Sequence, residues 1–217
     1  MDRIYTIGYS GFKIEKFLET LNFYSIKALI DVRSNPYSKH FLDYNKNILE
    51  NTLRKNGNIY RNYDIEFGAR QTDKKFYNSE GVLDFEKFSL SPQFQSGVKK
   101  ILKGLEQNYS FVLMCSEKEP INCHRAILVS RAFNELGIKV IHIMPDNKNF
   151  TQKDLELQML NKYFPDRMQG NLFEGFKSDE ELIKEAYKLC NAEIGYRMDG
   201  EKDKNELVYD RLHTKVS

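Results

Sequence analysis

The chain has 217 residues, of which 41% are hydrophobic and 29% charged, and its formal net charge is +2. This length and hydrophobic content predict one domain with an extension rather than two independent domains. The small net charge does not by itself predict nucleic-acid binding. Three cysteines without a close CxxC pair argue against a disulfide framework and favour reduced thiols.

Membrane insertion and secretion are not expected from the sequence. No apolar run approaches the roughly 20 residues needed to cross a bilayer, and the N-terminal residues Met1-Asp2-Arg3-Ile4 lack the apolar stretch of a signal peptide. We therefore expect a cytoplasmic protein with no membrane partner.

Strands and helices alternate through the first part of the chain. Residues 4–7 predict a strand, and the glycines of residues 8–11 allow a sharp turn. A helix with one apolar face should follow, on Ile14, Phe17, Leu18 and Leu21. Residues 27–33 then read as a strand buried on both faces, so the three elements form a right-handed parallel crossover.

The middle of the chain is less regular. An apolar helical face on Ile48, Leu49, Thr52 and Leu53 predicts a helix that ends at Gly57, followed by a strand over residues 59–63. Residues 64–84 show no periodic pattern of apolar residues. A loop of that length inside a compact domain is more often functional or mobile than idle.

The pattern of alternating elements resumes at Ser91-Pro92, a helix start in which serine caps the helix and proline fills its first turn. A strand over residues 109–115, a helix ending at Gly137 and a strand over residues 139–144 follow. We therefore predict an α/β domain over residues 1–145, with an open, mainly parallel sheet and flanking helices.

After Pro145 the pattern predicts helices only. Leu155, Met159 and Leu160 share one helical face, and Ser178-Asp179-Glu180-Glu181 is a capping box that introduces another helix. We expect residues 146–217 to form a helical C-terminal extension packed on the α/β domain.

Charge is unevenly distributed along the chain. Residues 33–75 carry nine Lys and Arg against five Asp and Glu, a local charge of +4, whereas residues 178–217 carry seven against ten, a local charge of −3. Six aromatic residues lie within the basic segment, and Phe76 and Tyr77 follow it directly. Aromatics among cations suit a surface that stacks bases and holds phosphates. An ordinary solvated surface is the stronger interpretation.

The most informative stretch is residues 111–125, in which a buried strand leads through a polar turn into a helix that opens on Cys123-His124-Arg125. We expect Asn122 to cap this helix and the next three residues to fill its first turn. A cysteine placed there has a lowered pKa, because the helix dipole and Arg125 favour its thiolate. Arg125 and the free N–H groups would also hold an anion. The competing interpretation is that Cys123 only packs in the core.

Two other classes of site fit the spacing poorly. Cysteine-dependent phosphatases and rhodaneses place an arginine six residues after their cysteine, whereas Arg125 follows Cys115 by ten and Cys123 by two. Cys115, Cys123 and His124 have the chemistry of zinc ligands, but adjacent side chains diverge on a helix and no fourth ligand is evident. We therefore expect no metal site.

Further polar residues should gather at the same edge of the sheet. Glu117 follows the strand that precedes Cys123, and a glutamate there would serve as a general acid or base if it is partly buried. Asp31 and Arg33 project from one face of their strand, and either stabilise each other or bind substrate. Tyr9 and Ser10 follow the first strand and reach the same rim, although Tyr9 also suits a core position. His142, within a strand, is interpreted as structural.

Several of these segments together resemble the domain-of-unknown-function family numbered 488. They are residues 4–10, 31–38, 113–117 with Pro120, 123–125 and 142–143, and the tail at residues 171–173 and 185–187 is similar to that of the longer members. The resemblance implies a Rossmann-like α/β fold. It also implies a shared site on Tyr9, Ser10, Arg33, Cys115, Glu117, Cys123, His124 and Arg125, and it implies no settled activity.

Two functions remain open at this point. One is an enzyme acting on an anionic substrate, a nucleotide or nucleic acid, with Cys123 as nucleophile or transition-state contact, Glu117 or His124 moving protons, and Arg33 and Arg125 holding charge. The other is a module that binds nucleic acid or a phosphorylated ligand without turnover, through the basic segment. A pure partner interface ranks last, and no cofactor is indicated.

Overall fold

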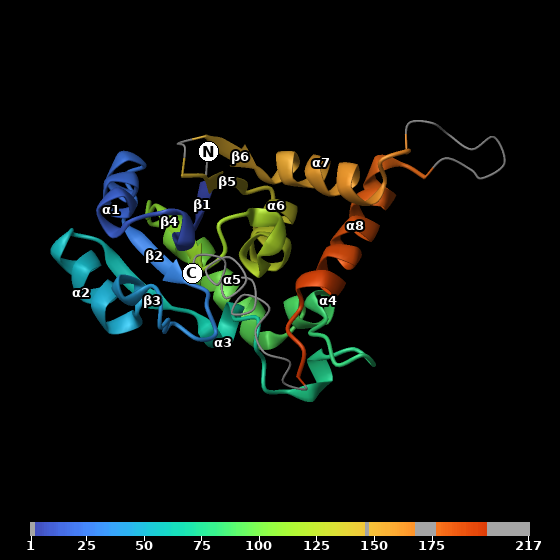
Figure 1. Ribbon diagram of the computed structural model, residues 1–217, viewed down its shortest axis with the longest axis horizontal. Helices are drawn as coiled ribbons and strands as arrows, with labels where there is room; N and C mark the ends of the chain where they lie inside the picture. Colours follow the sequence, from blue (N-terminus) through green and yellow to red (C-terminus); the bar gives the residue numbers. More distant parts are fainter. Residues whose placement is uncertain (1–2, 146–147, 168–176, 199–217) are drawn as a thin grey trace, which may run out of the picture.

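A parallel sheet forms the centre of the molecule, with helices on both faces (Figure 1). The computed structural model describes residues 3–145, 148–167 and 177–198. The strand order is β3-β2-β4-β1-β5-β6, and the first five of these strands run parallel. They are β1 (Arg3–Gly8), β2 (Ala28–Asp31), β3 (Ile59–Asn62), β4 (Phe111–Cys115) and β5 (Lys139–Ile143). The predicted α/β class, with an open, mainly parallel, Rossmann-like sheet, is confirmed.

Two separate cores show which helices cover which face. Side chains of β4 alternate between them: Val112 and Met114 pack with α1 (Ile14–Phe23) and α2 (Lys46–Lys55), whereas Leu113 and Cys115 pack on the opposite face. That opposite face is covered by α5 (Pro92–Glu106) and by a helix that begins as a π-helix (Arg125–Ser130) and continues as α6 (Arg131–Glu135). Strand β4 is thus buried on both faces.

The part of the chain between β3 and α5 contains more structure than its sequence indicates. Residues 64–84 were expected to be an irregular loop, but they include the single-turn helix α3 (Asp64–Phe67) and a 3-10 turn (Lys74–Phe76). A second short helix, α4 (Phe85–Ser89), follows. These elements are too short for an apolar period to show, and they are held by buried aromatic side chains such as Phe67 and Phe88.

Helices α7 (Gln152–Tyr163) and α8 (Asp179–Ile194) lie together at the side of the molecule away from α1 and α2 (Figure 1). Both begin with a capping box, on Thr151 and on Ser178. The expectation of helices only after Pro145 is wrong in one respect, because β6 (Asn149–Thr151) pairs antiparallel with β5. Three residues are too few for an alternating pattern to appear in the sequence. The division of the chain at residue 145 stays a prediction, and the tail segment 171–173 lies outside the described residues.

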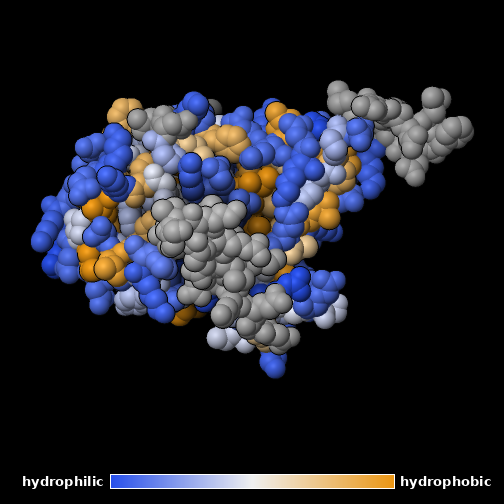
Figure 2. Space-filling model, viewed as in Figure 1, coloured by the Kyte–Doolittle hydropathy of each residue, from blue (hydrophilic) through white to orange (hydrophobic). Residues whose placement is uncertain are grey.

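The visible surface is mostly hydrophilic, with apolar side chains in small separate patches (Figure 2). Among the residues that the structure describes, no helix has the length and apolar character needed to cross a membrane.

Candidate functional site

The carboxyl ends of three neighbouring strands meet at one edge of the sheet. Gly8 at the end of β1 pairs with Cys115 at the end of β4, and the N–H of Val32, after β2, donates to the carbonyl of Met114 at 3.0 Å. The backbone approaches closely here: a Cβ atom on Gly8 would lie 1.8 Å from the carbonyl oxygen of Glu117. Glycine at this position therefore lets the chain after β4 lie against the end of β1.

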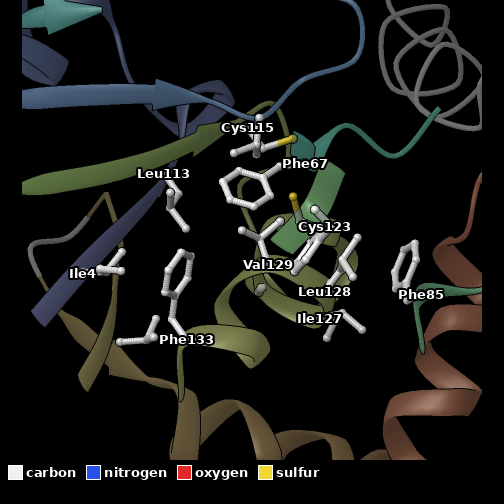
Figure 3. Packing of buried hydrophobic residues seen from close by; sticks show 14 of the residues in the cluster. Ile4, Phe67, Phe85, Leu113, Cys115, Cys123, Ile127, Leu128, Val129 and Phe133 are labelled. Carbon is white, nitrogen blue, oxygen red and sulfur yellow. The ribbon is translucent and has the colours of Figure 1, made fainter. Parts of the chain in front are cut away.

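Four reactive side chains converge at this edge, and we call them the thiol cluster: Cys115, Glu117, Cys123 and His124. Their donor atoms all lie within 4.8 Å of one another. Oε2 of Glu117 is 3.0 Å from the Sγ of Cys115 and 2.8 Å from the Sγ of Cys123. Both cysteines lie where the core meets the helix that follows β4, as Figure 3 shows. The four residues expected to share a site are thus close enough to share protons.

The helix after β4 does not begin where the sequence predicts. Pro120–Asn122 form a 3-10 turn, and Cys123 has an extended backbone (φ −136°, ψ 131°), so Asn122 is not the helix cap. The carbonyl of Cys123 accepts the first helical bonds, from Ala126 and Ile127, so Cys123 itself occupies the cap position. The proline and the extended residue place the Cys123 and His124 side chains on one side of the chain.

This local geometry corrects the argument that excluded a metal. Cys123 and His124 do not diverge, because only His124 is helical, and Glu117 supplies the fourth donor. Two thiols, an imidazole and a carboxylate are a donor set that zinc prefers. The thiol cluster could therefore hold a metal ion.

The imidazole of His124 is oriented by the backbone of β2. Its Nε2 donates to the carbonyl oxygen of Val32 at 2.9 Å, and its Nδ1 lies 3.8 Å from the Sγ of Cys115. Because Nε2 carries the donated hydrogen, Nδ1 is the nitrogen that faces the two cysteines.

The two thiols have opposite protonation tendencies. Burial raises the pKa of Cys123, but the hydrogen bond with Cys115 and the positive charges of Arg125 and His124 outweigh it, so the pKa of Cys123 lies well below its ordinary value. Burial and the neighbouring Cys123 raise the pKa of Cys115. Cys123 is thus the thiolate of the pair, and Cys115 the thiol that donates to it.

The pKa values of Glu117 and His124, which lie next to these thiols, are also shifted. Burial, together with the negative charge of Cys123, raises the pKa of Glu117 to about 7. Burial lowers the pKa of His124, but contact with Cys123 and the charge of Glu117 raise it by more, so its pKa lies above the ordinary value. A carboxyl group that titrates near neutrality beside a thiolate has the properties of a general acid or base.

Arg125 lies beneath the cluster with no exposed surface. Its Nη1 donates to the carbonyl of Glu117 at 2.5 Å and its Nη2 to the carbonyl of Lys118 at 3.1 Å. The sequence predicts that Arg125 contacts an anionic substrate, whereas the structure directs these donors to the backbone after β4. Its positive charge still acts on Cys123.

A chain of buried hydrogen bonds connects Arg125 to the C-terminal helices. Arg125 Nε lies 3.4 Å from Oγ1 of Thr6, which lies 2.8 Å from Nδ1 of His142, and Nε2 of His142 lies 3.0 Å from Oε1 of Gln152. The amide nitrogen of Gln152 donates to the carbonyl of Ala126 and to the hydroxyl of Tyr187. Because that nitrogen faces acceptors, Oε1 accepts from His142, whose Nδ1 in turn accepts from Thr6. Apart from the structural role of His142, this network could not be predicted from the sequence, because its members lie far apart along the chain.

Arg33 is buried in an ion pair with Asp31. Its Nε and Nη2 lie 2.8 and 2.6 Å from the two carboxylate oxygens, and Nη2 also donates to the carbonyl of Tyr44 at 2.9 Å. Nη1 is buried and has no hydrogen-bond partner in the part of the chain that the structure describes. Burial lowers the pKa of Arg33, but the bonds to Asp31 raise it more, and Cys115 is near enough to add to that increase. Arg33 is therefore a permanent cation near the thiol cluster, and its Nη1 is available to bind a ligand.

Tyr9 and Ser10 directly follow β1, at the same edge of the sheet as the thiol cluster. The ring of Tyr9 stacks on Tyr44 at a centroid distance of 4.4 Å, and the guanidinium of Arg33 lies 5.0 Å from its centroid. Ser10 is exposed, and its N–H donates to the carbonyl of Ser116. Ser10 thus offers a hydroxyl at the surface, while Tyr9 is buried and supports Arg33.

The aromatic residues of the basic segment are mostly part of the core. Of its six aromatic residues and the two that directly follow it, five are buried: Tyr44, Tyr60, Phe67, Phe76 and Tyr77. Tyr37 is 52% exposed. The segment therefore does not present a row of rings for stacking bases.

A protein-family model matches the part of the chain that contains most of the site. The model described as "Domain of unknown function DUF488" matches residues 13–132. The chain belongs to the DUF488 family. The match includes Arg33 and the whole thiol cluster, whereas Tyr9 and Ser10 of this DUF488 member precede it. No curated protein matches the chain, and no solved structure does.

Proposed function

We propose that this DUF488 protein is an enzyme whose reacting groups are the thiol cluster and whose substrate is anionic, a nucleotide or nucleic acid. The observation that carries the proposal is the pair of contacts from one carboxylate oxygen of Glu117 to two thiols, at 2.8 and 3.0 Å. Such an arrangement moves a proton between an acid and a nucleophile without rearrangement.

Each group has a defined role in this proposal. Cys123 is the thiolate that attacks the substrate or contacts its transition state, and Glu117 carries the proton. His124, held by Val32, stabilises the thiolate as a cation. Cys115 donates to the thiolate, and Arg125 holds the chain after β4 in place.

The anionic substrate is inferred from Arg33. A buried guanidinium nitrogen without a partner is costly, and an anion at the end of β2 would satisfy it. Substrates of open α/β sheets bind at the carboxyl ends of the strands, which is where this nitrogen and the exposed Ser10 lie.

Access to the thiols requires a local opening. Cys123 is 1% exposed and Cys115 is 2% exposed. A hollow of about 260 Å³ elsewhere, lined by Arg131, Tyr187 and Asn191 among others, does not include them. A test of thiol ionisation must therefore not depend on the entry of a reagent.

The ultraviolet absorbance of thiolates, followed against pH in metal-free protein, provides such a test. We expect a thiolate that ionises well below the ordinary thiol value and is lost in Cys123→Ser. The matched control is Cys190→Ser, because Cys190 is buried outside the cluster and its pKa is raised by burial. An unchanged titration in Cys123→Ser would contradict the enzyme proposal.

Substrate binding is tested with nucleotides, single-stranded oligonucleotides and inorganic phosphate, by calorimetry. We expect Arg33→Met to weaken the binding of one of these ligands at least tenfold, and Arg54→Met, an exposed arginine of the same basic segment, to have little effect. Equal losses in both variants, with steep salt dependence and no effect of Cys123→Ser, would instead favour the module that binds without turnover.

A further inference from the structure

The thiol cluster has the donor atoms, spacing and surrounding charge of a metal site. We infer that it binds one zinc ion, with its two sulfur atoms, the Nδ1 of His124 and a carboxylate oxygen of Glu117 as ligands. This inference goes beyond the proposed function, because it concerns what the cluster holds when no substrate reacts there.

The distances agree with tetrahedral zinc after a small adjustment. Zinc binds sulfur at about 2.3 Å and imidazole nitrogen at about 2.0–2.1 Å, so a sulfur and a nitrogen on one ion lie about 3.6 Å apart. Cys115 Sγ and His124 Nδ1 are 3.8 Å apart. The carboxylate oxygen, at 2.8 and 3.0 Å from the sulfurs, has to withdraw by about half an ångström to reach the spacing of zinc ligands. Glu117 is only partly buried, so its side chain can do so.

The histidine is already oriented for a metal. Ligating histidines usually donate their other ring nitrogen to a carboxylate or carbonyl oxygen, which fixes the ring and its tautomer. Nε2 of His124 donates to the carbonyl of Val32 at 2.9 Å and directs Nδ1 at the cysteines. No side chain has to change partner for Nδ1 to bind the ion.

The charges balance when zinc is bound. Two thiolates and one carboxylate contribute −3, and the ion contributes +2. Arg125, which is fully buried and bonded to the backbone of Glu117, contributes the remaining +1. A neutral set of charges is the arrangement that a buried site of low dielectric tolerates best. Soft sulfur ligands favour zinc over magnesium or calcium.

Four protein ligands leave no open position on the ion, as in structural zinc sites. Zinc would therefore link the end of β4 to the start of the following helix and occupy the atoms that the proposed reaction needs. Metal-bound and reactive states of the cluster exclude each other.

Zinc titration of the full-length protein tests the inference. Protein stripped of metal with a chelator under a thiol-free reductant is titrated with zinc against a chromophoric chelator, and native mass spectrometry counts the ions. We expect one zinc per chain in the native protein and in Cys190→Ser, and at least a hundredfold weaker binding in Cys123→Ser and Cys115→Ser. No stoichiometric zinc, or equal loss in Cys190→Ser, would overturn the inference.

Two further measurements guard against misfolded variants. Cobalt(II) in the native protein should give the intense ultraviolet absorption of thiolate ligands and the visible bands of tetrahedral coordination, and their absence would overturn the site. Zinc should raise the melting temperature of the native protein and of Cys190→Ser but not of a folded Cys123→Ser. The zinc inference and the proposed function can fail independently, because the thiolate titration that tests the proposed function uses metal-free protein.

Discussion

Glu117 Oε2 lies 2.8 Å from the Sγ of Cys123, so a carboxyl group and a thiol share a proton inside the protein. Each negative charge disfavours the other, which raises the pKa of Glu117 to about 7 after the effect of burial.

Replacing Glu117 with glutamine should leave the ionisation of Cys123 nearly unchanged. The negative charge of Cys123 raises the pKa of Glu117, so Cys123 ionises first and the carboxyl group is still neutral at that pH. The amide of glutamine keeps the shape and the neutral charge, so we expect the thiolate absorbance of Glu117→Gln to appear at nearly the same pH as in the native protein. Glu119→Gln, an exposed neighbour, serves as the control. A shift of the thiolate titration to clearly lower pH in Glu117→Gln would show that Glu117 is already charged when Cys123 ionises.

His124 should lower the pKa of Cys123. Its own raised pKa favours the cationic imidazole next to Cys123, so His124→Gln removes that positive charge and should raise the pKa of Cys123 by about one unit or more. Glutamine can still donate to the carbonyl of Val32. His40→Gln, on the exposed segment before α2, should leave the titration unchanged. If the two variants titrate alike, the cationic role of His124 is wrong.

His142 should make the folded state sensitive to acid. Burial, together with the charge of Arg125, lowers its pKa to about 3, below the ordinary value of 6.5. A folded pKa below the unfolded one gives stability that is present above pH 6.5 and is lost as the pH falls toward 3.

Urea denaturation at several pH values measures this effect. The free energy of unfolding should fall between pH 6.5 and pH 3 by an amount on the order of 4 kcal/mol from this group alone. His142→Gln can keep the contacts with Thr6 and Gln152 but cannot titrate, so its profile should be flatter. Equal slopes in the two proteins would show that His142 is not the group responsible.

Gly8→Ala should disturb the thiol cluster from the neighbouring strand. The added methyl would meet the carbonyl of Glu117 at 1.8 Å, so the chain after β4 has to move. We expect a loss of about 2–4 kcal/mol in the free energy of unfolding, in the range of severe steric substitutions. Ser10→Ala, two residues on and exposed, should stay within about 0.5 kcal/mol. A stable Gly8→Ala with an unchanged thiolate titration would argue against this close approach.

Arg33→Met should destabilise the fold through Asp31. Removing one partner leaves a buried carboxylate with no counter-charge, which costs about 3–5 kcal/mol. The double variant Asp31→Asn, Arg33→Met should recover part of that loss, because the uncompensated charge is gone. Denaturation of both variants measures the difference, and equal stabilities would mean that the ion pair is not the cause.

Much of the fold could be predicted locally. The strands at the ends of which the site lies are short, continuous apolar runs, and α1, α2 and α5 have clear apolar faces. The capping box of α8 and the cap of α5 on Ser91 are local signals as well. In contrast, α3, α4 and β6 are held by long-range contacts, and their sequences are too short to show a period.

The sequence predicted which residues form the candidate site, but not how their side chains are arranged. Sequence order placed Glu117, Cys123 and His124 in one connection between a strand and a helix, and the common edge of a parallel sheet brought Arg33 to it. The wrong helix start at Asn122 hid the convergence of Cys123 and His124, because a single extended residue after a 3-10 turn decides where these side chains point. No local sequence pattern could predict that Arg125 donates to backbone carbonyls.

The sequence by itself determined the α/β class, the family and the identity of the reactive residues, since apolar period, capping and motif spacing are local properties of the chain. Only the tertiary structure decided that two thiols, a carboxylate and an imidazole share one buried point, with Arg125 beneath them and Arg33 nearby. The four cluster residues and Arg125 lie between the end of β4 and the start of the following helix, but only the folded backbone turns their side chains toward one point. Arg33 comes near them because the sheet places the ends of β2 and β4 side by side.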